Sequence, residues 1–353
     1  MGGDATWRGR LRRYVALTRP FTLLPPTLGV LSGAVCAWGS YWNPSPDRSL
    51  TLDAALTVLL GSVCAALLNA GSNVINQIYD LDIDSINKPD RMIPSGKISL
   101  CAAWRFSWVL YVLAVLPVWL VVTYPAAGFL DRFFIPSAIP KPEGPFDVVV
   151  AIFNWHAVFF IFVVGMIFTF IYSAPALGRT KRFGIPANFT IAIPRGLLLK
   201  VAGWGMIGPV LAFEPWYIGS IFALFLLGAA STKDFSDIEG DRVGGCHTLP
   251  IRFGVKKAAW MMAPSFVLPW LLIPLGVLMS DPFDAGSGHP ILTGHPVALT
   301  VLGGLLALWG AFTVWLILRD PEALATTENH PSWIHMYLMM MAAQIGFALA
   351  YLI

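Results

Sequence analysis

Charge is scarce in this chain. Asp, Glu, Lys and Arg together make up 12% of its 353 residues, whereas soluble domains carry about 25%. A surface so poor in charge cannot face water on all sides, so the composition excludes an ordinary soluble domain and favours a protein embedded in lipid. The small net charge of +3 comes without a dense basic patch, and nothing in the sequence indicates a nucleic-acid partner.

Cysteine and histidine are few as well. The four cysteines stand singly in or near apolar runs and form no CxxC pair, and the six histidines are scattered. Neither residue type has the spacing of a zinc site or of a disulfide framework. We therefore interpret the cysteines as small buried apolar residues and assign no metal to the histidines.

Long apolar runs, by contrast, are abundant. A transmembrane helix needs about 20 mostly apolar residues, and the sequence predicts an all-α membrane protein of about nine such spans within one domain, 1–353. The nine segments are 21–39, 53–79, 101–124, 147–172, 187–208, 213–232, 257–280, 296–318 and 334–353.

The basic residues predict how these spans are oriented. Arginines precede the first span, and Lys and Arg recur in the loops after the second, fourth, sixth and eighth spans, whereas the opposite loops hold only Arg48, Arg132 and Lys141. By the positive-inside rule, the N-terminus and the basic loops lie on the cytoplasmic side of the cell inner membrane.

Two stretches lie outside the predicted spans. Residues 1–20 include a basic, amphipathic segment that is typical of a helix lying in the membrane interface. Residues 125–146 are rich in Pro and Gly and predict an extended loop on the non-cytoplasmic side, to which we assign no function.

The acidic residues are concentrated in two places. Of the 20 acidic residues, 8 fall within 80–90 and 234–241, each at the cytoplasmic end of an even-numbered span. Within both clusters, oxygen-bearing side chains recur every four residues, which places them on one face of a helix. The shared pattern consists of Asn76, Asp80 and Asp84 in the first cluster and Asp237 and Asp241, with Asp234 one turn earlier, in the second.

Like charges four residues apart repel each other, so a bound cation would stabilise both clusters. Ligands that are all oxygen suit Mg²⁺, which binds through a few carboxylates and substrate phosphates. One such cluster could be an ordinary solvated helix end. Two clusters with matching spacing on the same side of the membrane predict a magnesium site made of these six residues, with two ions.

Basic residues accompany the acids. Lys88, Arg91, Lys181 and Arg182 lie in loops that can converge on the two clusters and neutralise a diphosphate, although membrane topology alone would also explain them. Arg195 lies inside an apolar span, where an unpaired charge is costly, so we expect it to meet a cluster acid or a diphosphate.

Three segments resemble the signatures of a known family. NQIYDLDIDSINKPDRMIPSG at 76–96 and KDFSDIEGDRVGGCHTLP at 233–250 are similar to the paired motifs of the UbiA superfamily of intramembrane prenyltransferases. YSAPALGRTKR at 172–182, together with Arg19-Pro20, also fits that pattern, and the resemblance covers about 14–350.

The resemblance implies a fold and a mechanism. The fold would be two four-helix halves plus a last helix around a central cavity, with a polar cytoplasmic end and an apolar lower part for an isoprenoid tail. Two Mg²⁺ would hold the diphosphate of a polyprenyl donor, which ionises to an allylic carbocation that an acceptor attacks. The implied catalytic residues are Tyr172, Lys181, Arg182 and Arg91, and the implied substrate-binding residues are Lys88, Arg195 and Asn188.

The acceptor stays open between an aromatic and a lipid molecule. The motifs look closest to a branch that includes glycerolipid geranylgeranyl transferases, homogentisate prenyl transferases and chlorophyll synthases. The last usually carry Asn at the position of Lys233, which disfavours them.

Two other functions compete with prenyl transfer. Transporters place coupling carboxylates near the bilayer midplane, whereas the acids here lie at the rim. A lipid phosphotransferase of the CDP-alcohol type is disfavoured because its aspartates lie within one stretch.

Overall fold

A computed structural model describes residues 6–45, 47–122, 132, 144–284, 286–327 and 330–353. Within these ranges the chain is helical, and the one β pairing is an isolated bridge between Ser280 and Pro290, so the predicted all-α fold class is confirmed. The α-helices are α1 (Trp7–Thr18), α2 (Leu24–Gly39), α3 (Leu52–Tyr79), α4 (Leu81–Asn87), α5 (Leu100–Val115), α6 (Pro145–Trp155), α7 (Ala157–Ser173), α8 (Ile185–Ala192), α9 (Leu199–Trp204), α10 (Phe213–Ala229), α11 (Ile238–Val243), α12 (Leu249–Phe253), α13 (Val255–Met262), α14 (Leu268–Leu278), α15 (Pro296–Arg319), α16 (Ala323–Thr326) and α17 (Pro331–Leu352). Shorter segments are the 3-10 turns η1 (Pro20–Leu23), η2 (Leu116–Leu120), η4 (Pro175–Leu177), η5 (Thr180–Phe183), η7 (Ala230–Lys233) and η8 (Ala263–Phe266), and the π-helical η6 (Ile193–Leu198).

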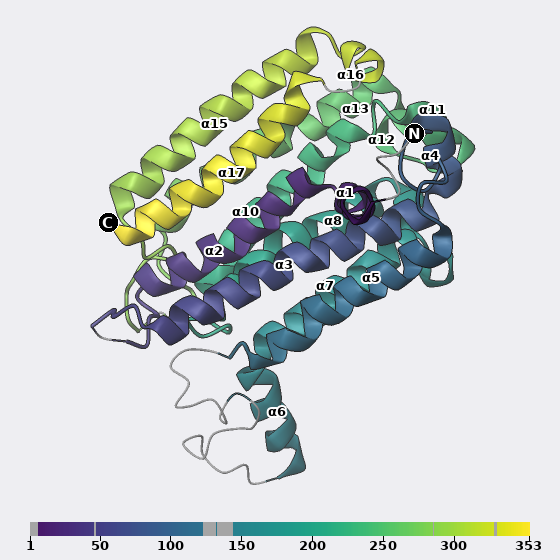
Figure 1. Ribbon diagram of the computed structural model, residues 1–353. Helices are drawn as coiled ribbons and strands as arrows, with labels where there is room; N and C mark the ends of the chain where they lie inside the picture. The colour runs from purple at the N-terminus through teal and green to yellow at the C-terminus, as the bar shows by residue number, and fades with distance from the viewer. Residues whose placement is uncertain (1–5, 46, 123–131, 133–143, 285, 328–329) are drawn as a thin grey trace.

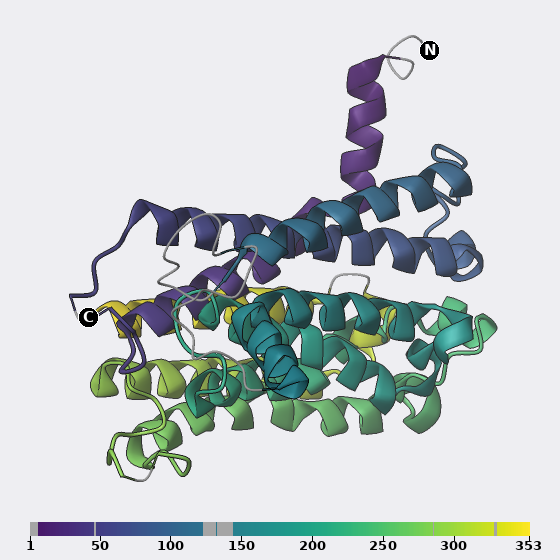
Figure 2. The same ribbon diagram turned by 90° about the horizontal axis from the view of Figure 1, so that it is seen from below.

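The long helices run side by side and form one bundle (Figures 1 and 2). The helix α2 packs against α3, α9 and α17, and α17 packs in turn against α15, so the last helix closes the bundle onto the first. Glycine permits the close approach of α2 and α9, because a Cβ at Gly203 would lie only 2.1 Å from the carbonyl oxygen of Val30. The tertiary packing thus joins the N-terminal and C-terminal parts of the chain.

Seven helices or helix runs in the described ranges are long and apolar enough to cross a membrane. They are Pro20–Gly39, Leu52–Tyr79, Leu100–Leu120, Phe213–Lys233, Val255–Leu278, Pro296–Arg319 and Pro331–Leu352. The pair α6 and α7 would make an eighth span, but it bends by 78° at His156, so the segment predicted as one straight span over 147–172 is broken there. The protein is therefore a multi-pass membrane protein.

The predicted fifth span differs from the others. Residues 187–208 are helical through α8, η6 and α9, but the run is widened by the π-helical turn, which contains Arg195, and it also carries Lys200. It is not among the helices that qualify as spans by composition, so the count of nine stays a prediction.

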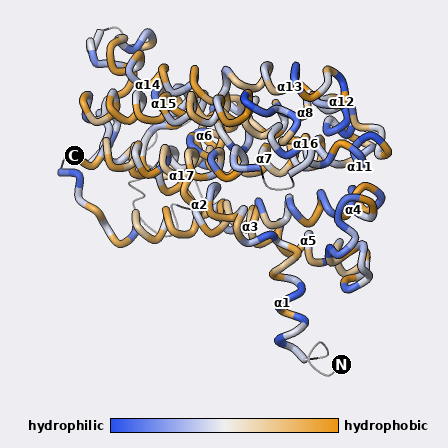
Figure 3. Tube along the Cα trace, turned by 90° about the horizontal axis from the view of Figure 1, so that it is seen from above, coloured by the Kyte–Doolittle hydropathy of each residue, from blue (hydrophilic) through white to orange (hydrophobic). Residues whose placement is uncertain are grey.

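The bundle has one polar end. Hydrophilic residues gather where α4, α11 and α12 lie, while the long helices are mostly hydrophobic (Figure 3). We call this the polar end. Exposed apolar side chains on the outside of the bundle, such as Leu305 at 62% and Leu308 at 71%, suit contact with lipid tails rather than with water.

In the described residues the N-terminal segment is helical from Trp7 to Thr18. In Figure 2 the helix α1 points away from the bundle, across the direction of the long helices, which fits a helix lying in the membrane plane. The predicted extended loop at 125–146 lies largely outside the described residues.

Candidate active site at the polar end

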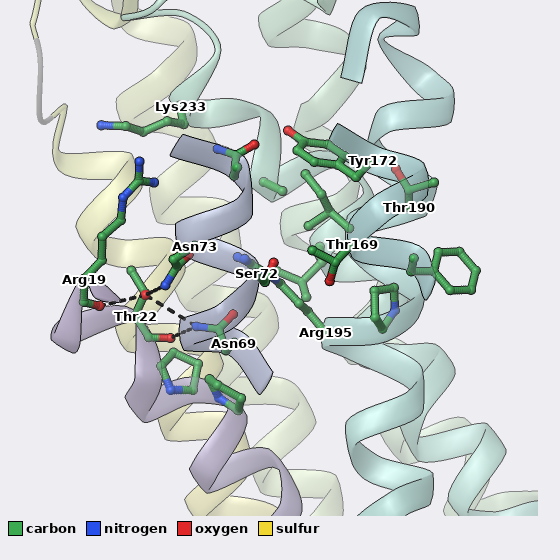
Figure 4. Close-up of a pocket in the computed structure, with 18 of the residues that line it drawn as sticks. Arg19, Thr22, Asn69, Ser72, Asn73, Thr169, Tyr172, Thr190, Arg195 and Lys233 are labelled. Carbon is green, nitrogen blue, oxygen red and sulfur yellow. Dashed lines mark hydrogen bonds between the residues drawn. The ribbon is translucent and has the colours of Figure 1, made fainter. Parts of the chain in front are cut away.

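A cavity of about 550 Å³ opens among α2, α3, α7, the α8–α9 run and α17. Acidic and basic side chains line it toward the polar end, and Figure 4 shows polar side chains from several helices facing into it. Farther along, its wall is apolar, with residues such as Leu68, Phe162, Leu226 and Met340. The cavity therefore has a charged mouth and an apolar interior.

The first acidic cluster keeps its predicted helical spacing. Asp80 joins α3 to α4, and the hydrogen bonds from Asp80 N to Asn76 O (2.9 Å) and from Asp84 N to Asp80 O (2.7 Å) continue the helical pattern through the junction. Asp80 and Asp84 are buried, and all three side chains line the cavity. A local periodicity was enough to predict this face.

The second acidic cluster lies at the same mouth. Asp237 and Asp241 flank the first turn of α11, where Asp241 N donates to Asp237 O at 3.0 Å, and Asp234 ends η7 just before it. All three line the cavity together with the first cluster, although about 150 residues of chain separate the two. The structure thus brings all six predicted metal ligands to one mouth.

Basic side chains pair with these acids. Lys181 Nζ lies 2.5 Å and Arg179 Nη2 3.3 Å from Asp80, Arg91 pairs with Asp84 at 2.5 Å, and Lys88 pairs with Asp237 at 2.8 Å. Arg179 was not predicted as a site residue, and it also donates to Tyr79 O at 3.0 Å. The sequence feature from which Arg179 could have been predicted is its position in the family-like segment at 172–182, two residues before Lys181.

Of four further predicted site residues, two lie off the cavity wall and two line it. The Arg182 side chain is exposed and away from the cavity wall, and its carbonyl accepts from His247 N at 2.8 Å. Asn188 is buried behind the wall and donates to Ser231 Oγ at 2.8 Å. Tyr172 lines the cavity near Thr190 (Figure 4), and Arg195 lines it too, away from the ion pairs.

The two acidic clusters are joined by Asn87. Its Oδ1 accepts from Gly240 N at 3.0 Å, and its Nδ2 donates to Asp237 O at 3.3 Å, so one amide group holds α4 against α11. A Cβ at Gly240 would lie 2.4 Å from Asn87 Nδ2, which shows how closely the two helices approach. This pairing sets the distance between the clusters.

We expect Gly240→Ala to lower turnover about 10- to 100-fold, because the added methyl pushes Asn87 and α4 away and misaligns the clusters. The double variant Gly240→Ala/Asn87→Ala makes room for the methyl, so its loss should be smaller than the sum of the two single losses, measured as a double-mutant cycle on kcat. Gly304→Ala, where a Cβ meets nothing within 4 Å, serves as the matched control. Strictly additive losses would show that the contact does not couple the clusters.

The donor set at the mouth fits a hard cation. Burial raises the pKa of Asp234 well above its usual range, and the charges of Asp241 and Asp237 raise it further. Burial also raises the pKa of Asp241 to about 6, although Lys181 opposes this. Asp84 Oδ2 is buried without a hydrogen-bond partner. Mutually repelling oxygens with a free acceptor atom are what a divalent cation would stabilise.

In this structure the carboxylates of Asp80, Asp84 and Asp237 form ion pairs with Lys and Arg side chains. In the described part of the chain, no three acidic, histidine or cysteine side chains gather closely enough to hold a metal ion. The four ion pairs explain this, since each basic side chain occupies a carboxylate that metal binding would need. A cation would have to displace them, which frees Lys and Arg for an anionic ligand.

Known proteins resemble this chain over nearly its whole length. The bacteriochlorophyll synthase 34 kDa chain of Chloroflexus aurantiacus is 28% identical over 96% of this chain and 91% of that protein. Digeranylgeranylglyceryl phosphate synthase of Thermococcus kodakarensis is 27% identical over 97% and 99%. Similarity to the bacteriochlorophyll synthase chain is thus about as strong as similarity to the glycerolipid enzyme.

Solved structures agree on the fold. A structure of digeranylgeranylglyceryl phosphate synthase superposes with a TM-score of 0.59 at 22% identity, covering 97% of this chain and 98% of that one. A UbiA homologue from Archaeoglobus fulgidus bound to GPP and Mg²⁺ gives 0.55 at 16% identity, covering 95% and 99%. The model of the UbiA prenyltransferase family matches residues 23–130 and 147–327, which is most of the chain. With the acidic clusters, basic partners and apolar cavity in place, this protein belongs to the UbiA prenyltransferase family.

Proposed function

We propose that the whole chain is one catalytic domain that moves a polyprenyl group, of geranylgeranyl or phytyl type, from its diphosphate to an aromatic or lipid acceptor. The observation that supports this most strongly is the placement of two acidic clusters and their basic partners at the mouth of an apolar cavity. The apolar interior suits the isoprenoid tail, and the charged mouth suits the diphosphate. The same arrangement leaves a transporter without support, because its carboxylates would be expected deeper in the bilayer.

The two acidic clusters are our proposed Mg²⁺ ligands. One ion would bind at Asn76, Asp80 and Asp84 and a second at Asp234, Asp237 and Asp241. The related Archaeoglobus fulgidus structure with bound GPP and Mg²⁺ supports a metal-dependent reaction. When bound, magnesium supplies positive charge to the diphosphate oxygens of the donor. The polar end would face the cytoplasm, as the basic loops predict.

The remaining charges act on the leaving group. As the allylic C–O bond breaks, its electron pair leaves with the diphosphate, and Lys181, Arg91 and Arg179 neutralise the added charge. Lys88 holds Asp237 in place. Tyr172 lines the cavity, where its ring can stabilise the allylic cation. The acceptor nucleophile then bonds to the cationic carbon and loses a proton, and prenylated acceptor and diphosphate leave.

Metal removal tests this function. In detergent-solubilised protein supplied with geranylgeranyl diphosphate and a panel of acceptors, we expect release of diphosphate with Mg²⁺, none with excess chelator, and recovery when Mg²⁺ is restored. The reason is that the diphosphate is a poor leaving group until its charge is neutralised. Turnover that persists in chelator would contradict the metal assignment. A failure of Mg²⁺ to promote either turnover or donor binding would contradict the prenyl-transfer proposal itself.

A further inference from the structure

The cavity has a measurable depth along α3. Its lining on this helix runs from Asp80 at the mouth to Ala65, and none of the α3 residues before Ala65 lines it. Figure 4 shows Asn73 and Asn69 of this stretch following one another down the wall. Ala65 precedes Asp80 by 15 residues in one helix, which corresponds to about 22 Å. The cavity therefore extends roughly that far below the acidic mouth.

Three helices close the deep end. The residues lining the cavity farthest from the mouth include Ala65 on α3, Phe162 on α7 and Ala202 on α9. All three are almost fully buried and belong to one cluster of packed apolar side chains. Because α3 and α7 both continue beyond these residues, side-chain packing closes the space there, and not the end of the helices.

Met206 lies just beyond this end. It follows Ala202 by four residues, about one helical turn farther from the mouth, and it is fully buried. Its tip occupies the place of a missing side chain on α3, since a Cβ at Gly61 would lie 2.8 Å from Met206 Sδ and closer still to its Cε. Gly61 precedes Ala65 by one turn on the same face of α3. The methionine therefore fills the space directly below Ala65 and Ala202.

The surroundings of Met206 leave little room beside it. The helix α7 approaches the end of α9 closely, because a Cβ at Gly205 would lie 3.1 Å from Val158 Cγ2. Gly61 and Gly205 thus let three helices come together, and Met206 fills the gap that remains. Methionine is suited to irregular gaps because its chain is unbranched and flexible.

The depth of the cavity matches an isoprenoid of about four units. With carbon–carbon bonds of about 1.5 Å, one extended isoprene unit advances about 5 Å, so a geranylgeranyl chain is about 20 Å long. Part of the depth belongs to the diphosphate, so four units reach the deep end and a fifth does not fit. One helical turn, about 5.4 Å, is close to the length of one unit. Removing the Met206 side chain would therefore add room for about one unit.

We propose that Met206, packed against Gly61, is the floor of the isoprenoid pocket and limits the donor to the length of a geranylgeranyl or phytyl chain. This inference rests on the proposed prenyl transfer and adds the donor length to it. A longer tail would have to displace packed side chains, which is unfavourable in a dense interior. A tail that left the cavity sideways between helices would not be sensitive to the floor.

Donors of increasing length test the floor. Farnesyl, geranylgeranyl, geranylfarnesyl and hexaprenyl diphosphate, with three to six isoprene units, compete in one mixture with Mg²⁺ and the acceptor on which the protein is most active. The product ratio then reports relative kcat/KM and is independent of the amount of folded protein. We expect the wild type to prefer geranylgeranyl over geranylfarnesyl diphosphate about 10- to 100-fold. Competition of the four donors for binding is a second readout that needs no acceptor.

Two variants should move the preference in opposite directions. Met206→Ala should remove most of the preference against geranylfarnesyl diphosphate, while hexaprenyl diphosphate stays a poor donor. Ala202→Leu, which adds bulk above the floor, should shift the preference toward farnesyl diphosphate about 10-fold. Met261→Ala, at an exposed methionine of α13, is the matched control and should leave the ratios unchanged.

A role of Met206 in packing alone would lower the Tm of Met206→Ala and leave the length preference unchanged, which would overturn the floor. Equal use of all four donors by the wild type would overturn it as well. A wild type that neither turns over nor binds any of the four donors with Mg²⁺ would instead refute the prenyl-transfer proposal.

Discussion

Replacing Asp80 with alanine should lower turnover about 100- to 1000-fold, the range reported when a preorganised charge is removed from an active site. Asp80 is only 3% exposed, and its two oxygens pair with Arg179 and Lys181. Its loss removes a proposed metal ligand and leaves two cations close together in a buried site. The measurement is kcat for diphosphate release at saturating Mg²⁺, with donor and acceptor in excess.

The chain offers a matched control two residues away. Asp82 carries the same side chain in the same turn but is exposed, so Asp82→Ala should change kcat by less than about 2-fold. Asp80→Asn, which keeps the volume of the side chain, separates a loss of charge from a loss of packing, and it should be nearly as inactive as Asp80→Ala. Full activity in Asp80→Asn, or equal losses at Asp80 and Asp82, would contradict the role of Asp80.

Replacing Lys181 with methionine should reduce kcat about 100-fold while raising the donor KM only slightly. Burial opposes the charged form of Lys181, but the charge of Asp80, with that of Asp241, raises its pKa above the ordinary lysine value, so it is a cation at neutral pH. Its charge stabilises the departing diphosphate more than the intact donor, and an interaction that strengthens in the transition state appears in kcat.

The separate effects of Lys181→Met on kcat and on the donor KM distinguish two roles for Lys181. A large rise in donor KM with unchanged kcat would mean that Lys181 binds donor and transition state equally, and the leaving-group role would be wrong. Lys97→Met is the control, since Lys97 is an exposed lysine in the neighbouring loop. Lys181→Arg should recover part of the lost kcat because it restores the charge.

Part of the mouth could be predicted from the sequence alone. Spacing of four residues within one helix is a local property, so Asn76, Asp80 and Asp84 could be assigned to one face without knowing any contact. Burial in lipid likewise follows from composition, because apolar runs of about 20 residues have few alternatives to spanning a membrane. The family resemblance then linked the two clusters, and the comparisons confirmed the family.

Other features depend on contacts between residues far apart in the chain. The bond from Asn87 to Gly240, the pairing of Arg179 with Asp80 and the exposure of Arg182 follow from how α4, α11 and the loop after α7 pack together. The break at His156 is likewise invisible to hydropathy, since both of its flanks are apolar.

The sequence by itself determined that this is an all-helical membrane protein with two acidic clusters, because periodicity and hydropathy act over a few turns of helix. Only the tertiary structure decided that Arg19 and Arg195 line the same cavity, at whose mouth both acidic clusters lie. Their separation of 176 residues along the chain carries no local signal. The physical reason is that the free energy of a buried charge depends on which groups the packing brings near it.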